Sequence, residues 1–357
     1  MPSFEGGGVE KNIILIANYF IKKNPSISII SSSKFVRKKF NKKINFIAPI
    51  SNLWSRLGRF PKYLICIFLL FKEYKKDKNF NVFCFQGNII CIIFCKIFQI
   101  KIIIRPNSSP SGWSKNLFKK VLFLKILSWS NLIIVNSYKF KKEIKMRFNL
   151  KSTCIYNPLN IKEIVKLSNK KINFEFFRND SLNLISVGRL VYQKDHITLL
   201  KAINYLKNRL KLKLLIIGEG DQKLKLLSFI KENNLEKNVK IKDRLENPFP
   251  FIKKSEIVVL SSKFEGLPNI LLEALALKKF IISSDCPTGP SEILDSGRGG
   301  LLFKVGNFKD LAKKILIYKK QKKKCEKMKK ISQKGIQRFD LNKNLLKYYN
   351  VFINLNY

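Results

Sequence analysis

Short runs of β-branched and aromatic residues alternate along this chain with longer stretches of helical periodicity, a pattern typical of parallel α/β units. In the first half the runs predict strands at Ser26–Ile30, Ile44–Ala48, Val82–Phe85, Lys101–Ile104, Leu132–Val135 and Thr153–Tyr156. In the second half they predict strands at Leu182–Val187, Leu214–Ile217, Val239–Ile241, Ile257–Leu260 and Phe280–Ser283. Helices are expected between the strands, for example over Trp54–Phe71 and Asn116–Ser128.

The alternation is interrupted once, which predicts two domains. The break is the run YNPLN at Tyr156–Asn160, and the following residues Ile161–Asp180 are polar and irregular. We therefore predict an N-terminal domain over 1–160, a linker over 161–180, a second domain over 181–335 and a C-terminal helix over 336–357 that packs back on the first domain. Each domain is expected to be doubly wound and Rossmann-like, and ligands bind such sheets at the carboxyl ends of the strands. The two domains should face each other across a cleft.

The chain opens on a glycine-rich stretch, EGGGVEKNIILIANYF. It predicts a turn feeding a helix from about Val9, with the amides of Gly7 and Gly8 free to meet an anion. Such a turn normally follows a strand, and only Met1–Phe4 precedes it here. The first domain thus lacks its first strand in this sequence. We expect the natural product to begin roughly 5–10 residues upstream, with an apolar strand in the interior of the sheet.

The formal net charge is +46, and residues 1–160 hold 29 Lys and Arg against 5 Asp and Glu, a net of +24. Compositional drift and attraction to anionic lipid both fit this excess, and a well-placed base contributes about 1 kcal/mol to lipid attraction. No nucleic-acid motif and no stripe of bases interleaved with aromatics is present, so no nucleic-acid partner is expected. The apolar, base-flanked run Arg59–Lys72 fits a core helix and a membrane-contact helix equally well.

The sequence favours a cytoplasmic protein that lies peripherally at the inner face of the cell membrane. It has no secretory signal, and its longest apolar runs, Tyr63–Phe71 and Asn88–Ile104, are too short or too interrupted to cross a bilayer of ~30 Å. The seven cysteines form no C-x-x-C pair and are interpreted as reduced core residues. No metal site is expected, because the single histidine, His196, lies far from most of them.

Two acids stand in the most core-like helical stretch, SSKFEGLPNILLEALALKK. Glu265 follows a strand on the loop at its carboxyl edge, and Glu273 lies eight positions later inside the helix. A buried carboxylate without a partner is costly, so each must meet a donor. For either acid alone, a favourable place in the helix dipole or a solvent-facing position remains an alternative.

Two cations follow another strand end, in the run SVGRLVYQKDH. Gly188 and Arg189 end the strand and Lys194 comes five residues later. Two cations on a strand-edge loop suit a diphosphate, although two surface bases in a Lys-rich chain would look the same. The run IIGEGDQ, with Gly218 and Gly220 around a tight turn, is a weaker signal of the same kind.

Taken together, these residues resemble the family-4 retaining glycosyltransferases of the GT-B fold, most strongly over Ser186–Ile315. The resemblance implies that Arg189 and Lys194 hold the donor diphosphate and stabilise the departing nucleotide, and that Glu265 faces the transferred sugar. Glu273 would accept hydrogen bonds from the ribose hydroxyls. The ligand's hydroxyls would then be the donors that meet both acids. The remaining donor-site residues implied are Gly7, Gly8, Gly188, Gly218, Gly266, Leu267, Pro268 and Asn269.

One departure from the family concerns histidine. Many relatives carry a first-domain histidine near the sugar, whereas the corresponding strand end here reads Gln86-Gly87-Asn88. His196 is interpreted as a capping or packing residue. Retention would then follow a front-face mechanism, in which the leaving phosphate assists deprotonation of the acceptor. We further expect the loop Arg105–Trp113 to bind the acceptor, with Arg105 available for a phosphate, and Asp285 or Glu292 to close the donor pocket.

The sequence therefore predicts a retaining glycosyltransferase that moves a hexose or N-acetylhexosamine from a nucleotide sugar, UDP-linked in our interpretation, to a lipid-linked or surface-glycan acceptor through an α-glycosidic bond. Neither metal nor cofactor is expected, since Arg189 and Lys194 would supply the charge that the leaving group needs. The alternative is a catalytically silent GT-B protein that binds a sugar nucleotide or a membrane glycan. The expected partners are the nucleotide sugar, a glycan or polyprenyl-diphosphate acceptor and an anionic membrane.

Overall fold

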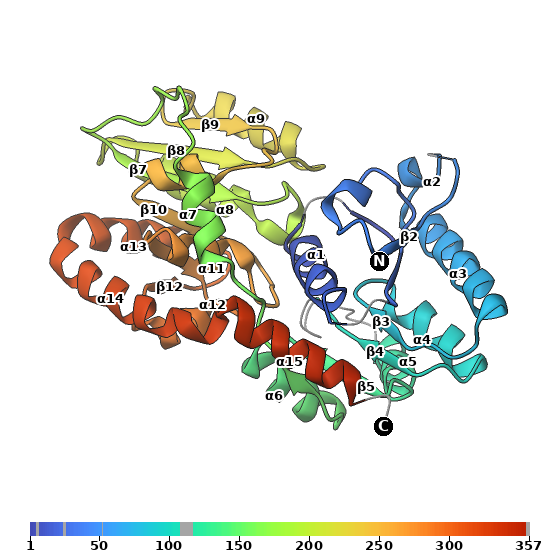
Figure 1. The fold of residues 1–357 in the computed structure, drawn as a ribbon. Helices are drawn as coiled ribbons and strands as arrows, with labels where there is room; N and C mark the ends of the chain where they lie inside the picture. Colours follow the sequence, from blue (N-terminus) through green and yellow to red (C-terminus); the bar gives the residue numbers. More distant parts are fainter. Residues whose placement is uncertain (5–6, 24–25, 52, 108–116, 355–357) are drawn as a thin grey trace. The chain divides into compact units, whose positions relative to one another are not determined.

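The structure is a computed structural model that describes residues 1–4, 7–23, 26–51, 53–107 and 117–354. Its chain divides into two units, which are described separately (Figure 1). Unit 1 comprises Met1–Pro158 together with Asn342–Tyr357, and unit 2 comprises Leu159–Leu341. No helix in the described part of the chain is long and apolar enough to cross a membrane.

Unit 2 is built on a six-stranded parallel sheet of order β12-β11-β10-β7-β8-β9. Its first strand, β7, lies in the interior between β8 and β10. The strands are β7 (Leu182–Val187), β8 (Leu212–Ile217), β9 (Val239–Lys242), β10 (Ile257–Leu260), β11 (Phe280–Ser284) and β12 (Leu301–Phe303). Five of them lie where the apolar runs predicted strands, and β12 was not predicted.

Both faces of this sheet are buried, which is why its strands read as nearly continuous apolar runs. On one face Leu184, Leu214 and Val259 join a core cluster with Leu199 and Ile315 from two helices. The alternate strand residues, such as Ile185, Leu215 and Val258, are buried as well. The helices of unit 2 are α7 (Ile161–Ser168), α8 (His196–Leu206), α9 (Lys223–Glu232), α10 (Phe249–Lys254), α11 (Asn269–Ala276), α12 (Pro290–Ile293), α13 (Phe308–Lys320) and α14 (Lys322–Lys334).

The predicted linker over 161–180 is wrong in its first part, because α7 is a helix of unit 2. The side chain of Asn160 caps its start and is itself held by the side chain of Glu163. Glu163 N donates to Asn160 Oδ1 at 3.2 Å, and Asn160 Nδ2 donates to Glu163 Oε2 at 2.8 Å. Ile164 then packs into the unit, and α7 lies against α10 and α11.

In the residues that the structure describes, unit 1 holds two separate parallel sheets. One pairs β1 (Ser28–Ile30) with β2 (Asn45–Ile47), and the other has the order β3-β4-β5-β6. The latter strands are β3 (Val82–Cys84), β4 (Ile102–Ile104), β5 (Leu132–Val135) and β6 (Thr153–Cys154). The helices are α1 (Gly8–Phe20), α2 (Leu53–Arg56), α3 (Arg59–Lys76), α4 (Asn88–Ile97), α5 (Leu117–Leu127), α6 (Tyr138–Phe148) and α15 (Leu341–Ile353).

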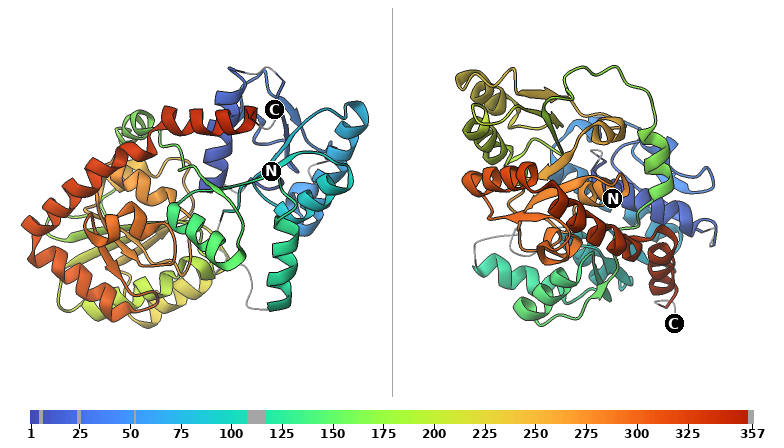
Figure 2. Two further views of the ribbon diagram at one scale, coloured as in Figure 1. Left: turned by 90° about the horizontal axis from the view of Figure 1, so that it is seen from below. Right: turned by 90° about the vertical axis from the view of Figure 1, so that its left-hand side faces the viewer.

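The single helix predicted over Trp54–Phe71 is two helices, because Gly58 has extended ψ and caps the start of α3. At the other end of the chain, α15 packs into unit 1. The Tyr349 ring lies edge-on against Phe20 of α1 at 5.5 Å, and Tyr348 lies 6.2 Å from Phe83 of β3. Two further views show the path of α15 at the end of the chain (Figure 2).

Candidate functional site

The loops that follow β7 and β8 touch closely, and their glycines make this possible. A Cβ at Gly218 would lie 1.9 Å from the carbonyl oxygen of Gly188, and one at Gly220 would lie 2.3 Å from that of Leu190. Leu190 N in turn donates to Glu219 O at 2.7 Å. Gly218, expected at the donor site, and Gly220 are therefore required here by the packing of two strand-end loops. Gly188 supplies the carbonyl that Gly218 contacts, and a Cβ on Gly188 itself would lie no closer than 3.6 Å to the Lys194 side chain. Gly218 and Gly220 bring the backbone of both loops to the carboxyl edge of the sheet.

Lys194 and Glu265 form a buried ion pair at this edge. Lys194 ends a short 3-10 turn after β7, and its Nζ lies 2.5 Å from Glu265 Oε1. The Ser262 hydroxyl donates to the same oxygen at 2.6 Å. The Glu265 side chain is 9% exposed and that of Lys194 is 16% exposed. The protein thus supplies donors to Glu265 itself, which corrects the expectation that only hydroxyls of a ligand would meet this acid.

Loops from three strands hold Glu265 in place. Ser261 after β10 donates to the Lys194 carbonyl at 2.9 Å, and Gln193 Nε2 donates to the Phe264 carbonyl at 2.8 Å. After β11, Thr288 Oγ1 donates to the Glu265 carbonyl at 2.6 Å. These bonds fix the acid through its backbone as well as its carboxylate, so its position is set before any ligand arrives.

Gly289 lets the loop after β11 reach that of Glu265. Its φ is +90°, and a Cβ there would lie 2.1 Å from the Gly266 carbonyl oxygen. Gly289 also directly precedes α12. Gly266, Leu267 and Pro268 are buried between the strand end and α11.

Glu273 lies within α11, eight positions after Glu265, and both acids are buried in unit 2. Pro268 has extended ψ and is the N-cap of this helix, so that α11 begins at Asn269. The helix starts one residue later than a proline in the first turn would imply. Arg189, next to Gly188, is exposed, whereas Glu273 is nearly enclosed.

His196 is buried at the start of α8. Burial, with a smaller contribution from the charge of Lys194, lowers the pKa of His196 to about 3. The imidazole is therefore neutral at ordinary pH. This agrees with the packing role expected from the sequence.

Arg105 does not have the availability expected of an acceptor-phosphate ligand. It is 1% exposed, and all three of its guanidinium nitrogens donate within unit 1: Nε to Tyr348 Oη at 2.9 Å, Nη1 to Asn107 Oδ1 at 2.7 Å and Nη2 to Asn157 Oδ1 at 2.5 Å. These bonds join the end of β4 to the loop after β6 and to α15. The prediction for Arg105 is wrong, since the group ties the last helix to the sheet. The rest of the expected acceptor loop, 108–113, lies outside the described residues.

The remaining candidates are spread over both units. Gly7 is the N-cap of α1 and Gly8 its first residue, both in unit 1. Asp285 is exposed at the end of β11, where its N–H donates to Phe303 O at 2.8 Å, and Glu292 lies in the first turn of α12. Gly87 takes a left-handed conformation (φ +67°) before α4, and Gln86 Oε1 accepts from Ser3 N at 3.0 Å.

Comparison with known proteins shows what unit 2 is similar to. Residues 168–335 match the family model described as glycosyl transferases group 1. The matched segment begins near the end of α7 and includes the loops after β7, β8 and β10 that hold the site. The prediction of a glycosyltransferase is thereby confirmed.

Several curated glycosyltransferases are similar to it. An uncharacterized glycosyltransferase of Methanocaldococcus jannaschii is 35% identical over 57% of this chain, which spans 53% of that relative's length. A Campylobacter jejuni N-acetylgalactosamine-N,N'-diacetylbacillosaminyl-diphospho-undecaprenol 4-alpha-N-acetylgalactosaminyltransferase is 29% identical over 80% of this chain and 81% of its own.

Solved structures show the same fold. Anabaena HepE in complex with UDP has a TM-score of 0.74 at 15% identity and covers 99% of this chain and 98% of its own. A glycosyltransferase from Rickettsia africae has a TM-score of 0.76 at 18% identity, with 99% and 96% covered. At such identity the likeness concerns the fold alone, and the predicted GT-B fold with its two Rossmann-like units is confirmed.

Sequence reasoning missed two residues of the site, Ser262 and Thr288 as bonding partners of Glu265. The double serine before Lys263 was a usable signal, because hydroxyls directly after a parallel strand lie at the ligand edge of the sheet. Nothing in the local sequence of Thr288 points to the Glu265 backbone.

Proposed function

We propose that this chain is a retaining glycosyltransferase that moves a hexose or N-acetylhexosamine from a UDP-linked donor to a lipid-linked or surface-glycan acceptor and forms an α-glycosidic bond. The observation that carries this proposal is the buried pair of Lys194 and Glu265 at the carboxyl edge of the unit 2 sheet, beside the closely packed loops of Gly188 and Gly218. The pair is held in place by the protein before any ligand binds, and charged groups fixed in advance are what stabilises a transition state.

In the proposed mechanism, Lys194 serves two partners. Its ammonium has three N–H groups, so one can stay on Glu265 while others reach the donor diphosphate. Exposed Arg189, at the same strand end, supplies the second cation. Lys194 Nζ and the Ser262 hydroxyl both donate to Glu265 Oε1. We assign the other carboxylate oxygen, Oε2, to a hydroxyl of the transferred sugar. Glu273 is assigned to the ribose hydroxyls.

The reaction step breaks the bond between the sugar anomeric carbon and the diphosphate oxygen and forms a bond from that carbon to the acceptor oxygen on the same face. The acceptor proton passes to the departing diphosphate, whose developing charge Arg189 and Lys194 stabilise. His196 takes no part in proton transfer, since its pKa is about 3 and it is buried.

The names of similar proteins support the choice of substrates. HepE was crystallised with UDP and with UDP-glucose. The Campylobacter relative is named for an acceptor linked to diphospho-undecaprenol. We therefore assign a UDP-sugar as donor and a polyprenyl-diphosphate glycan as acceptor.

The test is a screen of UDP-hexoses and UDP-N-acetylhexosamines, first by thermal shift and then by transfer to a broad panel of lipid-linked and soluble glycan acceptors. Retention is measured from the anomeric coupling constant of the product. Release of UDP with formation of an α-linked product is expected. If the chain binds UDP but neither hydrolyses nor transfers a UDP-sugar across the panel, the alternative of a catalytically silent GT-B protein is supported instead.

We also propose peripheral attachment to anionic membranes through α3. This helix has a buried face with Cys66 and Leu70, but it also exposes a stripe of large apolar side chains four residues apart: Phe60 is 63% exposed, Leu64 49% and Phe68 51%. Exposed Arg59 and Lys72 lie at its two ends. An apolar stripe flanked by bases is the arrangement that binds a lipid interface.

Flotation with anionic liposomes at low and high salt tests the attachment. The wild type should float at low salt and much less at high salt, because screening weakens the basic contacts. Leu64→Ser with Phe68→Ser should reduce flotation at both salts, whereas Leu224→Ser, which removes an exposed leucine on α9 of unit 2, should not. Absence of flotation at low salt would leave compositional drift as the explanation of the charge.

A further inference from the structure

The strand order of unit 1 follows that of unit 2 with two differences: β6 is an additional outer strand, and the described strands of unit 1 form two sheets instead of one. In unit 2 the first strand of the unit, β7, lies between the second strand, β8, and the fourth, β10. In unit 1 the corresponding neighbours are β1 and β3. They do not pair with each other, and each is the terminal strand of its own sheet. What is one sheet in unit 2 is therefore split in unit 1 at the place of a central strand.

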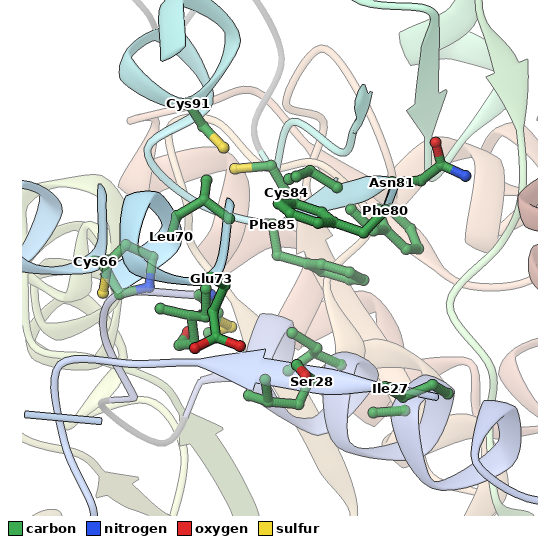
Figure 3. Close-up of a pocket in the computed structure, with 18 of the residues that line it drawn as sticks. Ile27, Ser28, Cys66, Leu70, Glu73, Phe80, Asn81, Cys84, Phe85 and Cys91 are labelled. Carbon is green, nitrogen blue, oxygen red and sulfur yellow. The ribbon is translucent and has the colours of Figure 1, made fainter. Parts of the chain in front are cut away.

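A cavity of about 410 Å³ lies at this split (Figure 3). Residues 26–30 of β1 and its approach line one side of it, and residues 80–86 around β3 line the other. Figure 3 shows Ser28 and Cys84 on these two sides. The remaining walls come from α1, α3, α4 and α15 and are mostly apolar, with Ile13, Ile16, Phe20, Cys66, Leu70, Cys91 and Phe352. Glu73, Lys76 and Asp77 at the end of α3 add charged groups to the lining, and Glu73 is labelled in Figure 3. Two strand edges and two mostly apolar layers are the surroundings of a central strand in a doubly wound sheet.

The path of the first residues fixes the direction of approach. Met1 N donates to the carbonyl of Ile30, the last residue of β1, at 2.8 Å, and Ser32 N donates to Pro2 O at 3.3 Å. Ser3 N donates to the side chain of Gln86, just beyond β3. Met1–Ser3 thus bridges the carboxyl ends of both strands. The chain then continues through Gly7 into α1, as a strand, turn and helix follow one another in a parallel unit.

We propose that this cavity is a slot for one β-strand, which pairs in parallel with β1 on one side and β3 on the other, and that its occupant is the segment of the same polypeptide directly before Met1. That segment would be about 5–6 residues long, apolar on both faces because helices cover both, and without proline, which cannot donate to either neighbour. It would join the two sheets of unit 1 into one. The inference does not depend on the activity proposed above.

The experiment compares two N-terminal extensions of the chain. One adds about six valine and isoleucine residues before Met1, and the matched control has the same length with two of them replaced by proline. Amide hydrogen exchange read by mass spectrometry is followed over Ser28–Ile30 and Val82–Cys84. We expect exchange in both strands to slow at least about 10-fold relative to the control, with a higher Tm for unit 1.

Three outcomes would overturn the proposal. They are exchange equal to that of the control in both strands, slowing in β1 or β3 alone, which would mean addition to one sheet edge, and slowing that depends on protein concentration, which would assign the slot to a second copy. If the extended chain is not obtained soluble, the same hexapeptide and its proline control are added to the chain as it stands. Slowing of both strands then supports the slot, and slowing of neither refutes it.

The DNA directly upstream of the Met1 codon tests independently whether the proposed strand belongs to this polypeptide. In-frame codons for a short apolar run directly before Met1 are expected. An in-frame stop codon directly before Met1 would refute the assignment of the occupant to this polypeptide.

Discussion

Replacement of His196 by leucine should remove the loss of stability that this histidine causes in unit 2 between pH 7 and 5. His196 is the single histidine of the chain, and burial lowers its pKa from 6.5 to about 3. Between these values the unfolded chain binds a proton that the folded chain does not. Stability contributed by the neutral imidazole is therefore fully present above pH 6.5 and is lost as the pH falls towards 3.

The expected size of the effect follows from this interval. Each pH unit well below 6.5 costs about 1.4 kcal/mol, so lowering the pH from 7 to 5 should cost the wild type about 2 kcal/mol through this one group. For a unit of this size, that corresponds to a Tm lower by about 4–8 °C. Leucine does not titrate and is of similar size, so the variant lacks this component whatever its own stability is.

The assay is urea unfolding of the wild type and His196→Leu at pH 5, 6, 7 and 8, with circular dichroism as the signal. The quantity of interest is the difference between the two proteins in the free energy lost from pH 7 to 5, which cancels any effect of leucine on packing. His196→Gln serves as a second non-titrating variant. If both variants lose as much as the wild type, to within about 0.5 kcal/mol, the folded-state pKa of His196 is near 6.5 and the reasoning from burial fails.

Four further predictions concern other groups. Arg189→Ala and Lys194→Ala should each lower turnover at least about 100-fold, since each removes fixed charge from the departing diphosphate; near-normal rates in both would refute their roles. Lys194→Ala should in addition destabilise unit 2 by about 3–5 kcal/mol, because it leaves the Glu265 carboxylate buried without its ion-pair partner, and unfolding curves equal to those of exposed Arg189→Ala would contradict this. Glu273→Ala should raise the donor KM with little change in kcat, because ribose contacts are alike in ground and transition states; a lower kcat at unchanged KM would speak against it. Tyr348→Phe removes an acceptor from buried Arg105 and should destabilise unit 1 by about 1–3 kcal/mol, a loss that differential scanning calorimetry would detect and whose absence would show that Asn107 and Asn157 suffice.

The strands in the interior of the unit 2 sheet could be predicted because they are continuous buried apolar runs, as in Leu182–Val187 and Ile257–Leu260. Local signals also existed for α7, where Asn160 and Glu163 form a capping pair that the polar character of the segment concealed. In contrast, β12 is three residues long and directly follows Gly299 and Gly300, so its run was too short to stand out.

The partners of the site residues could not be predicted, for a physical reason. Lys194 and Glu265 are 71 positions apart, and Arg105 and Tyr348 are 243 apart. The sequence indicated that Glu265 needs a donor, but the choice between a ligand and the protein depends on how two loops pack. The same holds for Arg105: it was expected to bind a ligand, but Tyr348 of α15 and two asparagines of unit 1 accept its hydrogen bonds.

The return of α15 to unit 1 has a consequence for biosynthesis. Unit 2 is inserted between Pro158 and Asn342 and is contiguous, whereas unit 1 needs Tyr348 and Tyr349 to satisfy Arg105 and to cover Phe20. On the ribosome, therefore, every residue of unit 2 is synthesised before unit 1 can complete its own packing. Residues 1–158, which are strongly basic, lack the packing of α15 while unit 2 is synthesised. That helix becomes available to complete unit 1 only at the end of translation.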